Sequence, residues 1–121
     1  MITGLTINTD GSTTPFATQG DHLRSLQKAV GGYVEIQRCG DVVLWFNEEG
    51  KIKDLPVNKS ATLLWWNLIP DVKGVDALRG TVIVTGGPDS AGETQSLNMH
   101  NQREILAFCG RAHRLFFTDT E

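Results

Sequence analysis

The segment 26–62 constrains the fold most, because its pattern changes from helix to strand and back to helix with a turn signal at each change. A helical pattern that begins after Asp21, a suitable N-cap, ends at Gly31-Gly32. Residues 33–38 alternate between polar and apolar, and residues 42–46 are almost continuously apolar, as in a central strand. After a turn at 47–50, residues 51–55 are predicted to return as a third strand. We therefore expect an antiparallel meander over residues 33–55.

The flanking segments add a hairpin, a further strand and two helices. Residues 2–8 and 13–18 are predicted to pair around the Asp10-Gly11 turn, with Pro15 on a sheet edge because proline lacks an N–H. The β-branched run 80–85 predicts the further strand. Helices are expected at 61–69, capped by Asn58 or Ser60, and at 99–109, capped by Ser96 or Asn98.

These elements predict an α+β fold with an N-terminal hairpin, a central antiparallel meander plus one further strand, and about three helices packed on the sheet. A chain of 121 residues has a common size for one domain, so we assign residues 1–121 to a single domain. Within it, residues 88–121 form a C-terminal loop and helix. Gly110 is expected to end that helix, and residues 114–118 could add a short terminal strand.

Composition excludes several classes of protein. The net charge of −3 argues against binding nucleic acid through its phosphates, although Arg111, His113 and Arg114 are locally basic. The two cysteines lie far apart, which indicates no disulfide scaffold and a reducing cytoplasm. No signal-peptide pattern is visible, and no apolar run approaches the roughly 20 residues of a membrane helix. We expect a cytoplasmic protein with neither membrane nor nucleic-acid partners.

No catalytic, cofactor or metal residues are predicted. Cys109 and His113 have a helical i, i+4 spacing, but no second pair completes a tetrahedral zinc site. Glu48 and Glu49 are adjacent acids in a polar turn, where we expect them to be exposed. No nucleophile motif occurs, since neither a G-x-S-x-G sequence nor a Cys-His signature is present. An enzyme assembled from separated residues remains open.

A polar cluster surrounds the expected start of the second helix. Lys51, Asn58, Lys59 and Thr62 place cations and hydrogen-bonding groups beside a helix N-terminus, which suits an anion. We predict these four residues as a pocket for a phosphate-bearing ligand. The alternative is a solvated polar face with a simple helix cap.

The expected helix 61–69 is apolar nearly all round, which indicates burial on more than one side. Its Trp65 and Trp66 are predicted as interface residues, and we expect a homo-oligomer. The alternative is that Trp45 and one of the helical pair fill the core.

Three segments carry a resemblance to a known family: VGGYVEI at 30–36, NEEGKIKDLPVN at 47–58 and RGTVIVTG at 79–86. Together they resemble the domain of unknown function 3846 family, small proteins common in bacteriophages, plasmids and integrated mobile elements. The match spans roughly residues 20–87 in order and spacing, and the segment after Gly87 lies outside it. The resemblance implies a mobile-element setting and assigns no activity. Its pattern residues are Gly31, Gly32, Tyr33, Glu35, Asn47, Glu48, Gly50, Leu55, Pro56 and Asn58.

Three functions follow as hypotheses. The first is a phage-encoded accessory protein that sequesters a small nucleotide-like ligand in host-defence evasion. The second is an inhibitor or interaction module that binds a host protein through the Trp65-Trp66 helix or the loop 86–95. The third is a small enzyme that acts on a nucleotide.

Overall fold

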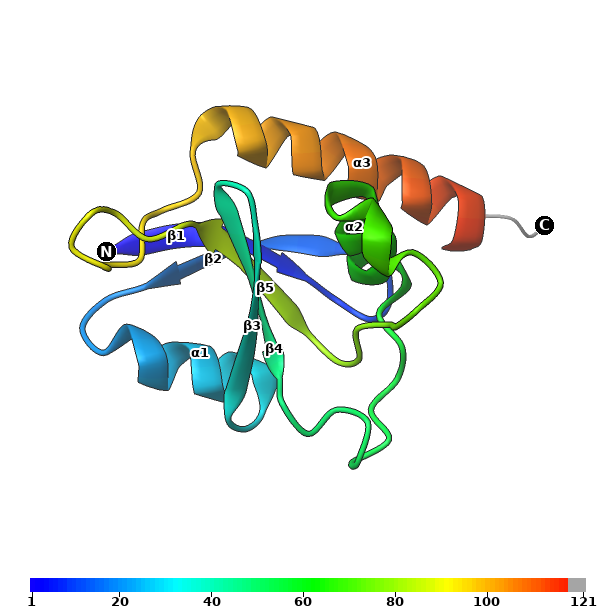
Figure 1. Cartoon of the computed structure of the whole chain (residues 1–121), viewed down its shortest axis with the longest axis horizontal. Helices are drawn as coiled ribbons and strands as arrows, with labels where there is room; N and C mark the ends of the chain where they lie inside the picture. The colour runs from blue at the N-terminus through cyan, green and yellow to red at the C-terminus, as the bar shows by residue number, and fades with distance from the viewer. Residues whose placement is uncertain (118–121) are drawn as a thin grey trace.

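One antiparallel sheet of five strands forms the middle layer of the protein, seen in a computed structural model that describes residues 1–117 (Figure 1). The strand order is β2-β1-β5-β4-β3. The strands are β1 (Ile2–Ile7), β2 (Thr13–Thr18), β3 (Val34–Cys39), β4 (Val42–Asn47) and β5 (Val82–Gly86). Every neighbouring pair is antiparallel, so β2 and β3 are the two edges.

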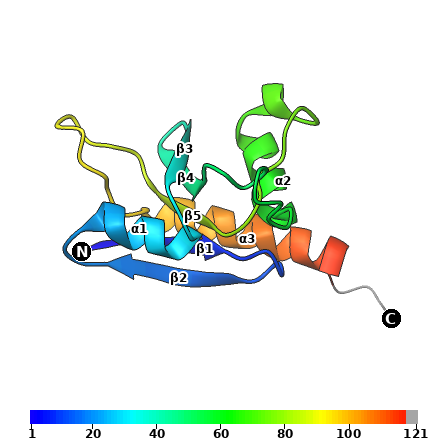
Figure 2. The same ribbon diagram turned by 90° about the horizontal axis from the view of Figure 1, so that it is seen from below.

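Helices cover both faces of the sheet. Helix α1 (His22–Val30) packs on one face, while α2 (Lys59–Leu68) and α3 (Met99–Phe117) lie together on the other (Figures 1 and 2). A short 3-10 helix, η1 (Pro70–Val72), follows α2. Among residues 1–117, no helix combines the length and apolar character that a membrane crossing requires.

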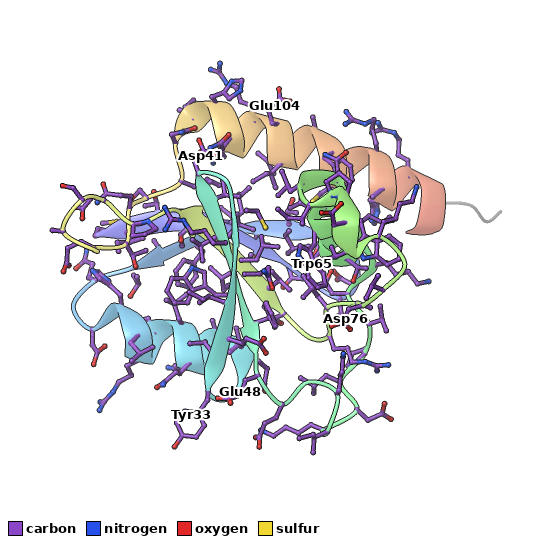
Figure 3. All side chains as sticks on the ribbon, in the orientation of Figure 1. Tyr33, Asp41, Glu48, Trp65, Asp76 and Glu104 are labelled. Atoms are coloured by element: carbon purple, nitrogen blue, oxygen red, sulfur yellow. The ribbon has the colours of Figure 1, made fainter. Side chains whose placement is uncertain are left out.

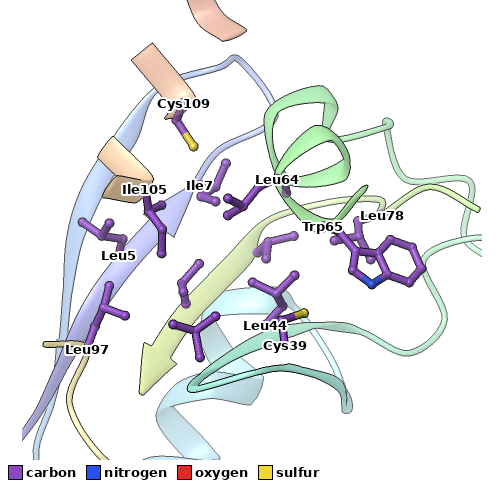
Figure 4. Close-up of a cluster of buried hydrophobic side chains, with 14 residues drawn as sticks. Leu5, Ile7, Cys39, Leu44, Leu64, Trp65, Leu78, Leu97, Ile105 and Cys109 are labelled. Atoms are coloured by element: carbon purple, nitrogen blue, oxygen red, sulfur yellow. The ribbon is translucent and has the colours of Figure 1, made fainter. Parts of the chain in front are cut away.

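Alternation along the strands divides the core into two clusters. Val82 and Val84 of β5 point toward α2 and α3, and Ile83 between them packs with Leu26 and Val30 of α1. Figure 4 shows the larger cluster, where side chains of β1, β4, β5, α2 and α3 meet. A strand with apolar side chains on both faces can be buried only in the middle of the sheet, where β5 lies.

The predicted α+β class is confirmed, together with the N-terminal hairpin and most helix ends. Asp21 caps α1 by accepting the Arg24 N–H at 3.0 Å, and Gly31 ends it at φ 83°. Pro15 lies on the β2 edge, as predicted. Asn58, one of the two predicted caps, begins α2.

The predicted third strand of the meander, 51–55, is wrong. These residues form tight turns, in which the Lys53 N–H reaches Glu49 O at 2.9 Å and Asp54 adopts φ 53°. β4 pairs instead with β5 on its far side from β3. A central strand at 51–55 would bury Lys51 and Lys53, whereas β5 offers apolar side chains to both layers.

The predicted end of the last helix is also wrong. α3 continues through Gly110, and residues 114–117 are helical rather than extended; Thr118 lies outside the described residues. Ile105, Cys109 and Ala112 keep one buried stripe across Gly110. Packing of that stripe outweighs the roughly 1 kcal/mol that glycine costs inside a helix.

Candidate functional site

A cleft of about 340 Å³ opens at the end of the β3–β4 pair opposite its tight turn. One wall comes from β3 and β4, another from the turns at 47–52, and a third from α2 and the segment 76–79. Figure 3 shows Glu48 at the open end of the β3–β4 pair and Trp65 and Asp76 near α2. The lining residues are Glu35, Gln37, Phe46, Asn47, Glu48, Gly50, Lys51, Ile52, Trp65, Asp76, Ala77, Leu78 and Arg79.

Local hydrogen bonds hold the turn wall of the cleft. The buried Asn47 side chain accepts the Glu49 N–H at 2.8 Å and donates to Val30 O at 3.1 Å, which ties the turn to the end of α1. At Gly50, an added Cβ would lie 3.2 Å from the Arg79 Cβ, so glycine allows this turn to approach the segment 76–79 closely.

The start of α2 is fixed by one buried amide. Asn58 is fully buried, and its side chain donates to Ile7 O and Gly80 O at 2.9 Å each while it accepts the Ala61 N–H at 3.0 Å. Thr62, one turn further on, exchanges hydrogen bonds with the backbone of Leu78. These bonds join α2 to β1 and to the segment before β5, and they set the position of Trp65 at the cleft.

Trp65 presents an unsatisfied donor at this cleft. Its side chain is only 5% exposed, and its indole Nε1 is buried without a hydrogen-bond partner. The other two indoles do have acceptors, since Trp45 donates to Thr85 Oγ1 at 2.9 Å and Trp66 donates to Asp76 O at 2.8 Å. Figure 4 shows the Trp65 ring at the edge of the core cluster. An unpaired buried N–H costs about 1–3 kcal/mol, and an acceptor reaches this one only when the atoms that cover the indole nitrogen move aside.

Charges of both signs surround the cleft. Lys51 pairs with Asp76 and holds the pKa of that carboxyl below its usual value. Arg79 donates to Leu55 O at 2.9 Å and lies 3.4 Å from Asp54. The exposed residues Glu35 and Glu48 line the same space from the strand side. The cleft therefore combines an apolar floor of Phe46 and Trp65 with separate donors and acceptors.

A profile described as "Domain of unknown function (DUF3846)" matches residues 2–109. The chain belongs to this family. The match extends on both sides of the 20–87 segment that carries the sequence motifs. No curated protein and no solved structure matches the chain.

Several residues of the DUF3846-like motifs meet at the cleft although they are separated in the chain. Glu35 comes from the YVEI motif, and Asn47, Glu48, Gly50 and Lys51 come from the NEEGK motif. Two other motif residues have structural roles elsewhere: Gly31 ends α1, and Asn58 anchors α2.

The four residues predicted to bind a ligand do not share one pocket. Lys51 lines the cleft, whereas Asn58 and Thr62 direct their polar atoms into the fold. Lys59 is exposed and, with Thr62, borders a separate apolar hollow of about 220 Å³ beside Trp66. The cleft groups that sequence reasoning did not propose as ligand-binding are Trp65, Glu35 and Arg79. The alternation of residues 33–38 places Glu35 and Gln37 on one face of the strand. It does not show which distant residues line the cleft with them.

The two predicted interface tryptophans differ in environment. Trp65 belongs to the core cluster, and Trp66 is partly buried between the hollow near Lys59 and a larger groove of about 540 Å³. The groove runs between α2, η1 and α3, with Leu63, Trp66 and Phe108 as apolar walls and Lys73 and Arg111 as cations. It offers few polar groups that converge on one point, unlike the cleft, so it suits a protein segment better than a small molecule.

The loop 86–95 is internally organised. Pro88 and Thr94 form an isolated bridge, and the Asp89 carboxylate accepts N–H groups from Ala91, Glu93 and Gln95. These contacts use both carboxylate oxygens of Asp89. Within the described residues, no group of three or more His, Cys, Asp or Glu side chains could hold a metal ion.

Both cysteines should be unreactive in the folded protein. Burial raises the pKa of the Cys39 and Cys109 thiols from 9.0 to about 11, so only about 0.1% is thiolate at pH 8. We expect Ellman's reagent at pH 8 to modify neither thiol quickly, and both at once in denaturant. Because the folded chain binds these protons more tightly, its stability should fall as pH rises from about 9 to 11. Rapid labelling of either thiol without unfolding would contradict this burial.

Proposed function

We propose that this protein is a non-enzymatic binder that sequesters a small nucleotide-like ligand in the cleft between β3–β4 and the segment 76–79. The observation that carries the proposal is the buried Trp65 N–H without an acceptor, at a cleft that also holds charged groups. Native proteins satisfy nearly all such groups, so an exception beside a cavity calls for an explanation, and a ligand that supplies the acceptor is the one we propose.

The groups in the cleft match the parts of a nucleotide. The Trp65 N–H suits a ring nitrogen or carbonyl oxygen of a base, while Glu35 and Glu48 suit exocyclic amino groups. The Phe46 ring offers an apolar surface for stacking, and Lys51 and Arg79 offer charge for a phosphate. The cleft also contains three acidic residues, Glu35, Glu48 and Asp76, which offset the positive charge of the two cations. A ligand with little negative charge, a monophosphate or a cyclic nucleotide, is therefore favoured over a triphosphate.

The size and composition of the cleft support binding without catalysis. Its volume of about 340 Å³ lies near the lower end of the range of small-molecule sites, about 300–1,000 Å³. Among the described lining residues there is no Ser, Thr, Cys or His that could act as a nucleophile with an adjacent base. The setting we propose, a phage gene acting in the host cytoplasm against a nucleotide defence signal, is supported by the family resemblance alone.

A matched pair of lysine variants tests this proposal. Nucleosides, nucleoside monophosphates and cyclic nucleotides would be titrated by native mass spectrometry and calorimetry. We expect Lys51→Ala to weaken binding of a phosphate-bearing ligand about tenfold, the loss of one charge-assisted hydrogen bond. Its stability should change by less than about 1 kcal/mol, because the Lys51–Asp76 pair is exposed.

Lys73→Ala is the control, since Lys73 is also exposed but lies in the groove beside Trp66. It should leave ligand affinity unchanged. Turnover of a bound nucleotide would support the enzyme hypothesis instead. Absence of binding across the panel would contradict the sequestration proposal.

The second candidate function is binding of a host protein, and the groove beside Trp66 favours it. Its apolar walls and the two cations Lys73 and Arg111 suit an acidic segment with apolar anchors. In that case Lys73→Ala should weaken capture of the host protein and Lys51→Ala should not, the reverse of the pattern expected for the cleft.

A further inference from the structure

The β3 strand leaves one edge of the sheet open. It lies at the end of the strand order, and within the described residues nothing pairs with its outer side. Such an edge offers a row of free N–H and C=O groups to another strand, and most proteins protect it.

The register identifies the free backbone groups. The Glu48 N–H donates to Tyr33 O at 3.0 Å, which makes Tyr33 and Glu48 a hydrogen-bonded pair. Because such pairs alternate along an antiparallel ladder, Glu35 and Gln37 also bond to β4. The two-residue turn at 40–41 is consistent with this alternation, because such a turn is closed by a hydrogen-bonded pair, here Cys39 and Val42. The N–H and C=O groups of Val34, Ile36 and Arg38 therefore point outward.

The opposite edge carries a proline that β3 lacks. On β2, the Asn8 N–H donates to Ser12 O, so by the same alternation Pro15 takes an outward-facing position. Proline has no N–H there to offer. β3 contains neither proline nor glycine nor lysine, and Ile36 at its middle is 51% exposed.

We infer that β3 pairs antiparallel with β3 of a second copy of this chain, about a two-fold axis at Ile36. In this register Ile36 lies opposite Ile36 of the second copy, and Val34 lies opposite Arg38. On the other face, Glu35 lies opposite Gln37, where a carboxylate can accept from an amide. A shift by two residues would place Glu35 opposite Glu35 or Ile36 opposite Arg38, which are poorer cross-strand pairs.

This pairing joins the two clefts. Glu35 and Gln37 line the cleft on the α2 face, so Gln37 of the second copy lies next to Glu35 at the cleft's outer wall. The dimer itself forms without a ligand, and its test is independent of the proposed function.

Cysteine cross-linking tests the pairing and its register. At the two-fold axis, the Cα atoms of Ile36 in the two copies would lie about 5.5 Å apart. A short bifunctional thiosulfonate should therefore join Ile36→Cys into a covalent dimer. Arg38→Cys is the matched control on the same face, because its two copies would be offset by about 13 Å along the strands, four residues at about 3.3 Å each, in addition to the spacing between the strands. The native thiols are buried and should not interfere. Equal cross-linking of both variants, or none of Ile36→Cys, would overturn the inference.

Solution measurements test it without added cysteines. In sedimentation velocity the wild-type chain should be a dimer at micromolar concentration, and Ile36→Lys should be a folded monomer. Thr14→Lys, on the β2 edge, should remain a dimer. Amide exchange at Ile36 and Arg38 should slow as protein concentration rises. A wild-type monomer with fast exchange at both amides would overturn the pairing, as would an Ile36→Lys dimer.

Discussion

Replacing Asn58 with alanine should lower the free energy of unfolding by about 3–5 kcal/mol, since it removes an N-cap and two further hydrogen bonds that the buried amide donates to backbone carbonyls. Those carbonyls belong to Ile7 and Gly80, on the strand β1 and just before β5. The side chain is fully buried, so water cannot replace the lost donors. Urea denaturation followed by tryptophan fluorescence measures the change.

The control is Asn67→Ala, the same substitution at an exposed position of the same helix, which should change stability by less than about 0.5 kcal/mol. Asn58→Asp separates the two roles of the amide. It keeps an acceptor for the Ala61 N–H but directs a carboxylate at two carbonyl oxygens, so we expect it to be at least as destabilising as alanine. If Asn58 instead reads a ligand, Asn58→Ala would lower affinity and cost less than about 1 kcal/mol of stability.

Replacing Trp65 with phenylalanine should affect stability and binding differently. The change removes an N–H that has no acceptor in the free protein, and this gain offsets the loss of packing from the smaller ring. Stability should therefore change by less than about 1 kcal/mol, whereas affinity for the cleft ligand should fall about tenfold.

Trp66→Phe is the matched control for Trp65→Phe. Its indole donates to Asp76 O, so its removal leaves that carbonyl without this donor, and we expect a loss of stability of about 1 kcal/mol. Ligand affinity should change less than in Trp65→Phe, since Trp66 lines the groove rather than the cleft. Equal affinity of wild type and Trp65→Phe would show that the indole does not contact the ligand.

Local signals predicted the parts of the fold that depend on neighbours in sequence. The Asp10-Gly11 hairpin, the Asp21 and Gly31 caps of α1 and the apolar β4 strand all follow from such signals. The identity of the strand next to β4 could not be predicted from such signals, because both 51–55 and 82–86 are suitable by pattern. The structure places 82–86 there, since its apolar side chains pack against the helices on both faces of the sheet. α3 passes Gly110 for the same reason, since its buried stripe is a tertiary feature.

The candidate site was harder to predict from the sequence than the fold, because tertiary packing alone brings its residues together. Lys51 was predicted as a ligand-binding residue and lines the cleft. The side chains of Asn58 and Thr62 instead form hydrogen bonds with backbone groups of distant segments. The key feature of Trp65 is a missing acceptor, which depends on every residue packed around the indole. A sequence pattern identifies the tryptophan but not its unsatisfied N–H.

The most direct test of ligand binding in the cleft is the indole N–H region of a ¹⁵N-labelled NMR spectrum. The three tryptophans should give three signals, which Trp45→Phe, Trp65→Phe and Trp66→Phe would assign. On addition of a nucleotide that binds, the Trp65 signal should shift as its N–H gains an acceptor, together with the amides of Glu35 and Gly50. The Trp45 signal should stay in place because Thr85 already accepts that N–H. A panel that leaves Trp65 unmoved, or a ligand that shifts only Trp66 and Arg111, would contradict the account.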